Sequence, residues 1–505
     1  MKFLLYFLYK NLSDIKIIII YQIKLIYLFM PTVIVNREKL FEQIGESFTD
    51  EKFDEICFEF GIELDEITSE QEIYQNEQKK ENKELSKEVL YKIEVPANRY
   101  DLLCLEGLAI SLRVFLGKSQ ITKYIVSPSR EQFIVDKSVE TIRPFGMSAI
   151  LRNISFTEES LIGFMELQDK LHSNICRGRT LVSMGTHDLD TVQGPFHYKT
   201  VHRDAFEFVP LNRTEKFTGT TLLTHLATDP KLKHFVPLLA KEDYFPVVLD
   251  SNGIVMAVPP LINSEHSKLK VSTKNVIIDI TAKDLTKANI VLNTLVSMFS
   301  MYCATPFSIE SVKVVTPDGQ ASDYPKMQPR FFKTEKSYLN RISGLELSVE
   351  EMSSLLLRMG LNSVPEGDTI KVEAPVTRSD ILHACDIAED LAISYGYNNI
   401  VKRKPSTICN GAQQPINKLT DLIRLEMALS GYVECLTMAL MTVDDMMANM
   451  LEEPTKEKLS NAVQIFKSKC PEFQVFRNSL IPGLLKTIEA NKANQVNYIF
   501  NLVTL

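Results

Sequence analysis

An eight-residue pattern, Glu-x-Pro-x-x-Arg-x-Asp, occurs twice in this chain of 505 residues, at 94–101 and at 373–380. The segment before each copy repeats as well. Residues 49–61 and 348–360 each begin with a helix N-cap residue, carry apolar residues at helical spacing and end on a glycine. The chain is therefore predicted to contain one small helix–strand–helix module twice, with the copies far apart in sequence.

The two copies differ in length. Between the closing glycine and the glutamate of the pattern, the first copy is longer by about 20 residues, which matches the polar run 69–88. We interpret this run as a surface insertion in the first copy. The arginines of the two patterns, Arg99 and Arg378, are predicted to be structural.

Bulk properties limit the class of protein. A chain of 505 residues is too long for one core, so three or four domains are expected. The net charge of −8 argues against a surface that binds nucleic acid all over, although an RNA partner held mostly by another subunit stays open. The eight cysteines form no CxxC pair, which indicates buried reduced thiols rather than a zinc site or a disulfide framework.

Four carboxylates accompany the second copy, and the last three have the spacing of one helical face. Like charges at this spacing repel one another and lower stability unless a bound cation or an arginine neutralises them. Oxygen ligands without Cys or His suit Mg²⁺, so the predicted metal ligands are Asp380, Asp386, Glu389 and Asp390. The alternative is a solvated helix N-terminus. For Asp380 a helix cap is a further alternative, because its counterpart Asp101 lies in a copy without the later acids.

Segments in four regions of the chain together resemble the β subunit of phenylalanyl-tRNA synthetase, of the archaeal and eukaryotic cytosolic type. The resemblance extends from about residue 31 to about residue 498. The segments that carry it, in the order of the family, are 96–101, then 185–188 with 259–266, then 378–390 with 395–399, and finally 477–485.

The resemblance implies an α+β multidomain fold, in which copies of the small module flank an α/β editing domain and a partial class II synthetase-like antiparallel-sheet domain follows. The expected divisions are a spurious or disordered extension (1–29), the first module with its insertion (30–130), the editing domain (131–305), a linker (306–325), the second module with the Mg²⁺ site (326–402) and a truncated, inactive synthetase-like domain (415–505).

The function that the resemblance implies is that of a subunit. Two α and two β chains would form a cytoplasmic heterotetramer without a membrane partner, and the α subunit would use ATP and Mg²⁺ to attach phenylalanine to tRNA(Phe). This chain would bind tRNA(Phe) and hydrolyse mischarged Tyr-tRNA(Phe). A free-standing editing protein or a non-catalytic tRNA-binding scaffold is the alternative if the C-terminal truncation is real.

Editing answers a physical problem, because an apolar pocket for phenylalanine rejects the added hydroxyl of tyrosine poorly. The resemblance implies that Glu265 reads this hydroxyl, in a pocket formed by Thr186, His187, Asn263, Glu265, His266 and Thr273. No Ser-His-Asp or Cys-His arrangement is legible in the sequence, so attack by water is expected. The alternatives are a surface pair of Glu265 with Lys268 or Lys270, and histidines that bond to backbone.

Two further expectations concern arginines and the ends of the chain. Arg177 and Arg179 either contact tRNA phosphate or form surface ion pairs. Residues 1–29 have the restricted composition of translated non-coding sequence, without a signal cleavage site and with charges in every window of about 20 residues. A membrane anchor or a targeting peptide is the alternative there. The end at Leu505 is interpreted as an incomplete gene model or an isoform.

Overall fold

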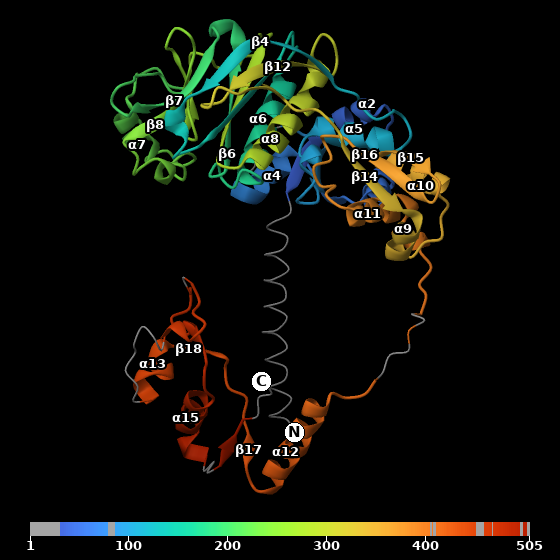
Figure 1. Ribbon diagram of the computed structural model, residues 1–505, viewed down its shortest axis with the longest axis vertical. Coiled ribbons are helices and arrows are strands. Elements are labelled where there is room, and N and C mark those ends of the chain that lie inside the picture. Colours follow the sequence, from blue (N-terminus) through green and yellow to red (C-terminus); the bar gives the residue numbers. More distant parts are fainter. Residues whose placement is uncertain are drawn as a thin grey trace. The chain divides into compact units, whose positions relative to one another are not determined.

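The computed structural model describes residues 31–78, 86–404, 407, 411–450, 459–466, 468–494 and 498–501. The chain divides into two compact units, Met1–Val401 and Lys402–Leu505 (Figure 1). The expectations about residues 1–29 lie outside the described residues. Part of the predicted insertion 69–88 is helical, as α4 (Glu70–Gln78).

The first repeat, here called module one (residues 31–117), is a three-stranded antiparallel sheet with helices packed on it. Its strand order is β1-β3-β2. Thr49 caps the N-terminus of α3, and Gly61 ends that helix in a left-handed conformation, as the sequence predicts. The elements are β1 (Thr32–Asn36), α2 (Arg37–Ile44), α3 (Asp50–Phe60), β2 (Glu63–Thr68), β3 (Leu90–Glu94) and α5 (Leu105–Phe115).

The second repeat, module two (residues 330–400), has the same kinds of element in the same order. Its sheet has the equivalent strand order, β14-β16-β15, and Ser348 forms a capping box at the start of α10. The elements are β14 (Arg330–Glu335), α9 (Lys336–Ser343), α10 (Val349–Arg358), β15 (Asn362–Glu366), β16 (Thr369–Ala374) and α11 (Ala384–Tyr395).

The two modules pack against each other in a reciprocal way. Helix α3 of module one contacts α11 of module two, and α10 of module two contacts α5 of module one, so equivalent helices exchange partners. Arg358 of α10 connects the two modules. Its guanidinium lies 4.5 Å from the ring centroid of Phe115 in module one and donates hydrogen bonds to the carbonyls of Phe115 and of Ser394 in module two.

The arginine and aspartate of the repeated pattern form the same ion pair in both modules. Arg99 binds Asp101 at 2.8 Å, and Arg378 binds Asp380 at 2.7 Å. Arg378 also binds Asp390 of α11 at 2.7 Å. Burial raises the pKa of Asp390, whereas the pKa of Asp380, which burial would also raise, is held below its ordinary value by Arg378. Both arginines are buried, in agreement with the structural role expected for them.

A ten-stranded mixed sheet forms the centre of the first unit. Its order is β10-β9-β8-β7-β4-β12-β5-β11-β6, with β13 beside β12. The ends of this order meet, because β10 lies against β6, so the sheet curls around an interior face. The strands are β4 (Ile125–Val135), β5 (Phe145–Leu151), β6 (Val182–Asp188), β7 (Phe196–His202), β8 (Tyr244–Leu249), β9 (Val255–Val258), β10 (Ile262–Asn263), β11 (Val276–Ala282), β12 (Ser308–Val315) and β13 (Ala321–Tyr324).

Helices α6 (Glu158–Ser173) and α8 (Leu285–Phe299) cover one face of this sheet (Figure 1). Along β6 and β11 successive side chains alternate between the helix-covered face and the interior face. The predicted linker at 306–325 differs from the structure, because most of it forms β12 and β13 within the sheet. Val312 and Val314 of β12 are buried, which gives this segment the burial of a central strand.

The second unit has a small core of Met441, Met446, Met447 and Val475. Its described residues pair into two short two-stranded ladders, β17 with β20 in parallel and β18 with β19 antiparallel, rather than into the predicted antiparallel sheet. The elements are α12 (Pro415–Leu429), β17 (Val433–Glu434), β18 (Leu440–Met441), α13 (Val443–Met446), β19 (Val475–Phe476), α15 (Ile481–Ala490) and β20 (Ile499–Phe500). Across the part of the chain that the structure describes, no helix has the length and apolar character to cross a membrane.

Replacing Arg378 by methionine tests the ion pairs between Arg378 and the acids of module two. Asp380 and Asp390 would stay buried without their cation, which is expected to lower the free energy of unfolding by about 3–5 kcal/mol. Urea-induced unfolding of the full chain measures this. Arg113→Met, at an exposed position of α5, is the control and is expected to change the value by no more than about 0.5 kcal/mol. Equal losses in both variants would contradict the assigned role.

Candidate functional site

Four of the six predicted pocket residues lie in one segment, residues 259–275, between β9 and β11. The first buried anchor of this segment is a chain of hydrogen bonds to the sheet. His187 of β6 places Nδ1 2.8 Å from Ser267 Oγ and Nε2 2.8 Å from Asp279 Oδ1 of β11. The backbone N–H of Asp188 donates to the carbonyl of Ser267 at 2.9 Å. The middle of the segment is thus bound to the last two residues of β6.

A second anchor holds the far end of the segment. The hydroxyl of Thr273 donates to Asp188 Oδ2 at 2.7 Å, and both residues are buried. His187 and Asp188 therefore fix two points of the same loop from adjacent positions on one strand. Because the loop is held at Ser267 and at Thr273, the residues before and between these two contacts have a fixed position.

The Ser267–His187–Asp279 chain is the arrangement that the sequence did not reveal. Exposed fractions of 1%, 0% and 1% place the three side chains out of reach of solvent, so the chain serves as an anchor rather than as an exposed nucleophile. The available signal was Asp279, the one charged residue within the mostly apolar strand Val276–Ala282. A buried carboxylate requires a partner.

Gly185 makes the anchor possible. It lies opposite Asp279 in the register of β6 and β11. A Cβ at this position would lie 2.2 Å from Asp279 Oδ1 and 2.7 Å from His187 Nε2. The absence of a side chain at Gly185 therefore leaves the space that the histidine–aspartate pair occupies.

Glu265 and His266 lie before the first anchor and reach the surface. Glu265 is 34% exposed; its Oε2 accepts a hydrogen bond from the backbone N–H of Asn212 at 2.5 Å, and its Oε1 lies 3.3 Å from Lys268 Nζ. His266 is exposed, and its Nε2 donates to the carbonyl of Thr191 at 2.9 Å. The pair with Lys268 and the backbone bond of His266 are the interactions that the alternative interpretations expect.

The six predicted residues fall into three groups. Asn263 in β10, Glu265 and His266 lie on the partly exposed side of the loop, while His187 and Thr273 are its buried anchors. Thr186 lies on the opposite face of β6, toward α6, where its hydroxyl bonds to Gln168 Oε1 at 3.3 Å. Adjacent residues of a strand point to opposite faces, so Thr186 does not share a pocket with His187.

Arg179 also belongs to this region, in a role that neither sequence interpretation covers. Its guanidinium donates to the carbonyl of Leu261 at 2.9 Å and lies 4.2 Å from the ring centroid of Phe235. Burial lowers the pKa of Arg179. The buried Arg143 donates in turn to the carbonyl of Arg179 and to that of Thr281. Arg179 thus ties residues 259–261 to the sheet, whereas Arg177 is exposed.

The four acids predicted to bind Mg²⁺ have other partners. Asp380 and Asp390 bind Arg378, and Asp386 accepts hydrogen bonds from the backbone N–H groups of Leu382 and His383 at the start of α11. Glu389 is exposed. Within the described ranges, no group of three or more His, Cys, Asp or Glu side chains is arranged to hold a metal ion. These residues do not fit a metal as they stand, and the magnesium site stays a prediction that elemental analysis of the purified protein tests.

Gly185→Ala tests the anchor. The new methyl group would push against the Asp279 carboxylate and His187, so the free energy of unfolding is expected to fall by about 1–3 kcal/mol. Amide hydrogen exchange in residues 262–275 is expected to accelerate because the loop loses its first anchor.

The control for this substitution is Gly163→Ala in α6. A Cβ there has Glu106 Oε1 as its nearest contact, at 3.9 Å, so this change is expected to be neutral or stabilising. If amide hydrogen exchange in residues 262–275 is equally fast in the two variants, His187 and Asp279 do not hold the loop.

Comparison with known proteins gives matches along most of the chain. Residues 30–118 match the model of the Phe-tRNA synthetase beta subunit B1 domain, residues 332–397 the tRNA synthetase B5 domain, and residues 400–502 the phenylalanyl tRNA synthetase beta chain CLM domain. An N-terminal fragment of the phenylalanyl-tRNA synthetase beta subunit from Pyrococcus horikoshii has a similar structure, with a TM-score of 0.66 and 31% identity. The match covers 72% of this chain and 99% of the fragment.

Full-length relatives agree with these matches. The phenylalanine–tRNA ligase beta subunit of Mus musculus is 46% identical over 469 residues, which cover 92% of this chain and 79% of the mouse protein. That of Dictyostelium discoideum is 45% identical over 476 residues, which cover 92% of this chain and 76% of the relative. The resemblance read from the sequence motifs is confirmed: the chain belongs to the β-subunit family of phenylalanine–tRNA ligase, an aminoacyl-tRNA synthetase, in its eukaryotic form.

Proposed function

We propose that this chain acts with an α subunit in the attachment of phenylalanine to tRNA(Phe), and that it removes tyrosine from mischarged Tyr-tRNA(Phe). Two α and two β chains would form the enzyme in the cytoplasm. The α subunit would hold ATP with its Mg²⁺. Family membership supports the first part of the proposal, and the anchored loop that carries Glu265 is the observation that supports the second.

Glu265 has the chemistry needed to distinguish tyrosine from phenylalanine. An ionised carboxylate only accepts hydrogen bonds, and its two oxygens offer about four acceptor positions. Asn212 and Lys268 use some of these positions and hold the side chain in place. A free position can accept the hydroxyl of tyrosine, whereas phenylalanine offers no donor. A charge-assisted hydrogen bond contributes about 1.5–3 kcal/mol, or roughly 10- to 150-fold discrimination.

His266 is suited to orient the water that attacks the ester. Because its Nε2–H donates to the carbonyl of Thr191, the neutral ring keeps Nδ1 as an acceptor. An exposed Nδ1 acceptor beside Glu265 can hold a water next to the bound aminoacyl group. His187 and Thr273 act through the loop, as positioning residues. The hydrolysis then needs no covalent intermediate on the protein.

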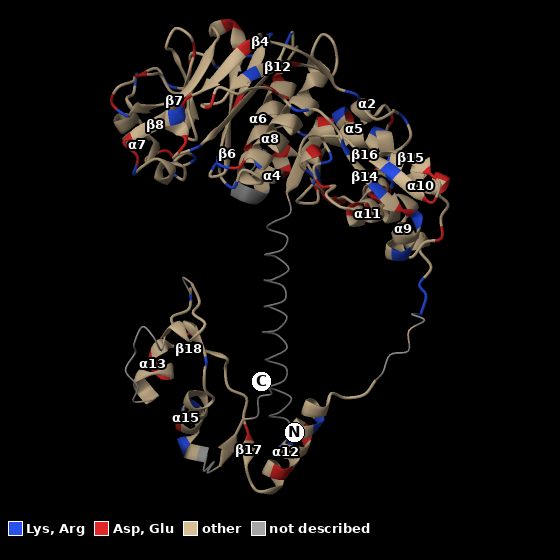
Figure 2. Cartoon of the chain, in the orientation of Figure 1, with Lys and Arg blue, Asp and Glu red and all other residues tan. Residues whose placement is uncertain are grey.

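The charge distribution favours shared tRNA binding. Figure 2 shows Lys and Arg interspersed with Asp and Glu along the ribbon, in keeping with a net charge of −8. Phosphate binding depends on concentrated positive charge. We expect the other subunit to supply much of the electrostatic attraction to tRNA, while this chain receives the aminoacyl end.

Glu265→Gln and Glu265→Ala test the editing role in the complex with the α subunit. Deacylation of Tyr-tRNA(Phe) is expected to fall by roughly 10- to 150-fold, because the acceptor for the tyrosine hydroxyl is weakened or lost. Charging with phenylalanine should stay near the parent rate. Glu207→Gln, at an exposed position on the neighbouring segment, is the control and should leave both rates unchanged.

Two outcomes would contradict this assignment. If neither rate changes in the Glu265 variants, the hydrolytic site lies elsewhere in residues 131–305. If both rates fall together while the unfolding free energy drops, Glu265 supports the fold instead of reading the substrate.

A further inference from the structure

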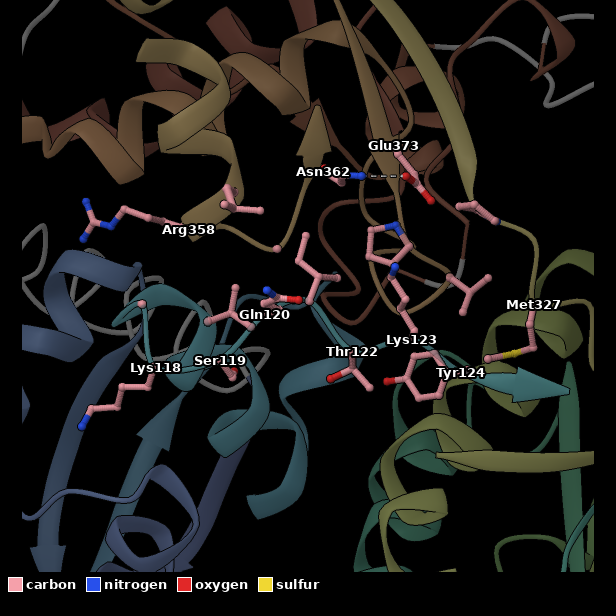
Figure 3. A pocket seen from close by; sticks show the side chains of 18 residues that line it. Lys118, Ser119, Gln120, Thr122, Lys123, Tyr124, Met327, Arg358, Asn362 and Glu373 are labelled. Atoms are coloured by element: carbon pink, nitrogen blue, oxygen red, sulfur yellow. Dashed lines mark hydrogen bonds between the residues drawn. The ribbon is translucent and has the colours of Figure 1, made fainter. Parts of the chain in front are cut away.

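A cavity of about 880 Å³ lies between the two modules (Figure 3). One wall is residues 117–124, the segment that follows α5. The other wall comes from module two, at the junction of α10 with β15 and at the end of β16, where Glu373, Pro375 and Val376 line it; Met327 and Pro329 close one side. The volume is in the range of specific ligand sites, which is about 300–1,000 Å³. None of the residues of the proposed editing site lines this cavity.

The first wall presents unpaired main chain. Residues 117–124 line the cavity without interruption, so the backbone itself borders the space and not only alternate side chains. Among the described residues, no backbone hydrogen bond involves the N–H or C=O groups of residues 119–124; pairing resumes at Ile125, whose N–H donates to Phe307. Six consecutive residues with free donors and acceptors form a template for another extended chain.

Positive charge predominates around the cavity, in contrast to the net negative chain. The lining carries three cationic side chains but one carboxylate, Glu373, which accepts a hydrogen bond from Asn362 at 3.0 Å. Lys118 is paired with Glu46 and Arg358 with carbonyls, so within the described ranges Lys123 is the lining cation without a partner. Figure 3 shows Lys123 extending from its wall into the space below Asn362 and Glu373.

Apolar side chains complete the lining on both sides. Ile121 and Tyr124 come from the first wall, Leu357 and Val376 from module two, and Met327 from the segment between them. Free main-chain groups, one unpaired cation and apolar contacts together match an extended peptide better than a compact small molecule, because a row of N–H and C=O groups is complementary to another main chain.

We propose that this cavity binds an extended acidic peptide segment of a partner protein. The main chain of the peptide pairs with residues 119–124, one of its carboxylates binds Lys123, and its apolar side chains lie against Tyr124 and Met327. The modules then serve as a docking platform, separate from the loop that carries Glu265. The proposal does not depend on the editing function.

The test uses the full chain in complex with its α subunit and two labelled peptides, Asp-Val-Asp-Val-Asp and Lys-Val-Lys-Val-Lys, both blocked at the ends. Fluorescence polarisation at low salt is expected to detect binding of the acidic peptide alone. Lys123→Glu should weaken this binding by about tenfold or more, because it replaces a charge-assisted contact with repulsion. Lys313→Glu is the matched control, with the same charge change at an exposed residue of β12, and should leave affinity unchanged.

Main-chain pairing has its own readout. Binding should slow amide hydrogen exchange in residues 119–124, and a version of the acidic peptide with alternate N-methylated amides should bind more weakly by a similar factor. The proposal is overturned if neither peptide binds, if the two lysine variants weaken binding equally, which indicates unspecific charge attraction, or if N-methylation and exchange show no effect.

Discussion

The buried ion pairs of Arg378 are the interaction on which the arrangement of module two depends. The side chain is 4% exposed and contacts Asp380, Asp390 and the carbonyl of Met359, while its own carbonyl accepts from Arg330. Taking such charges out of water is costly, and the cost is offset only if every partner is in place. The surrounding loops therefore have little freedom. This fixes α10 and α11, and through Arg358 it fixes α5 and the cavity wall that follows α5.

The same reasoning explains what the sequence could predict. The duplication was legible because caps, closing glycines and the Arg-x-Asp pattern are local signals that each act within a few residues. The binding partners of the acids in module two could not be predicted from the sequence. Arg378, which binds Asp390, lies on the loop before α11 and not at helical spacing from Asp390, so only the fold brings the two side chains together. The strands within 306–325 were missed because proline and glycine, which favour loops, flank the buried valines.

The anchored loop shows a second limit of sequence reasoning. Gly185, Ser267 and Asp279 come from three segments, and the pairing of β6 with β11 decides which of them meet. A shift of one residue in this register would turn Asp279 to the helix-covered face and leave His187 without its carboxylate. Four of the six residues predicted from motifs lie on this loop, but the motifs did not show which of the six are buried. Residues that hold the loop are buried, whereas Glu265 and His266 stay accessible.

The difference between the modules explains which groups bind the acids of module two in this structure. Module one has Ile110 and Ser111 where module two has Glu389 and Asp390, so Arg99 keeps one carboxylate partner and Arg378 has two. The added Asp390 binds Arg378, whose equivalent in module one is Arg99. Asp386 caps the start of α11 by accepting a hydrogen bond from the backbone N–H of His383. One exposed carboxylate then remains, and a single carboxylate gives a divalent cation too few ligands unless another chain or a phosphate supplies the rest.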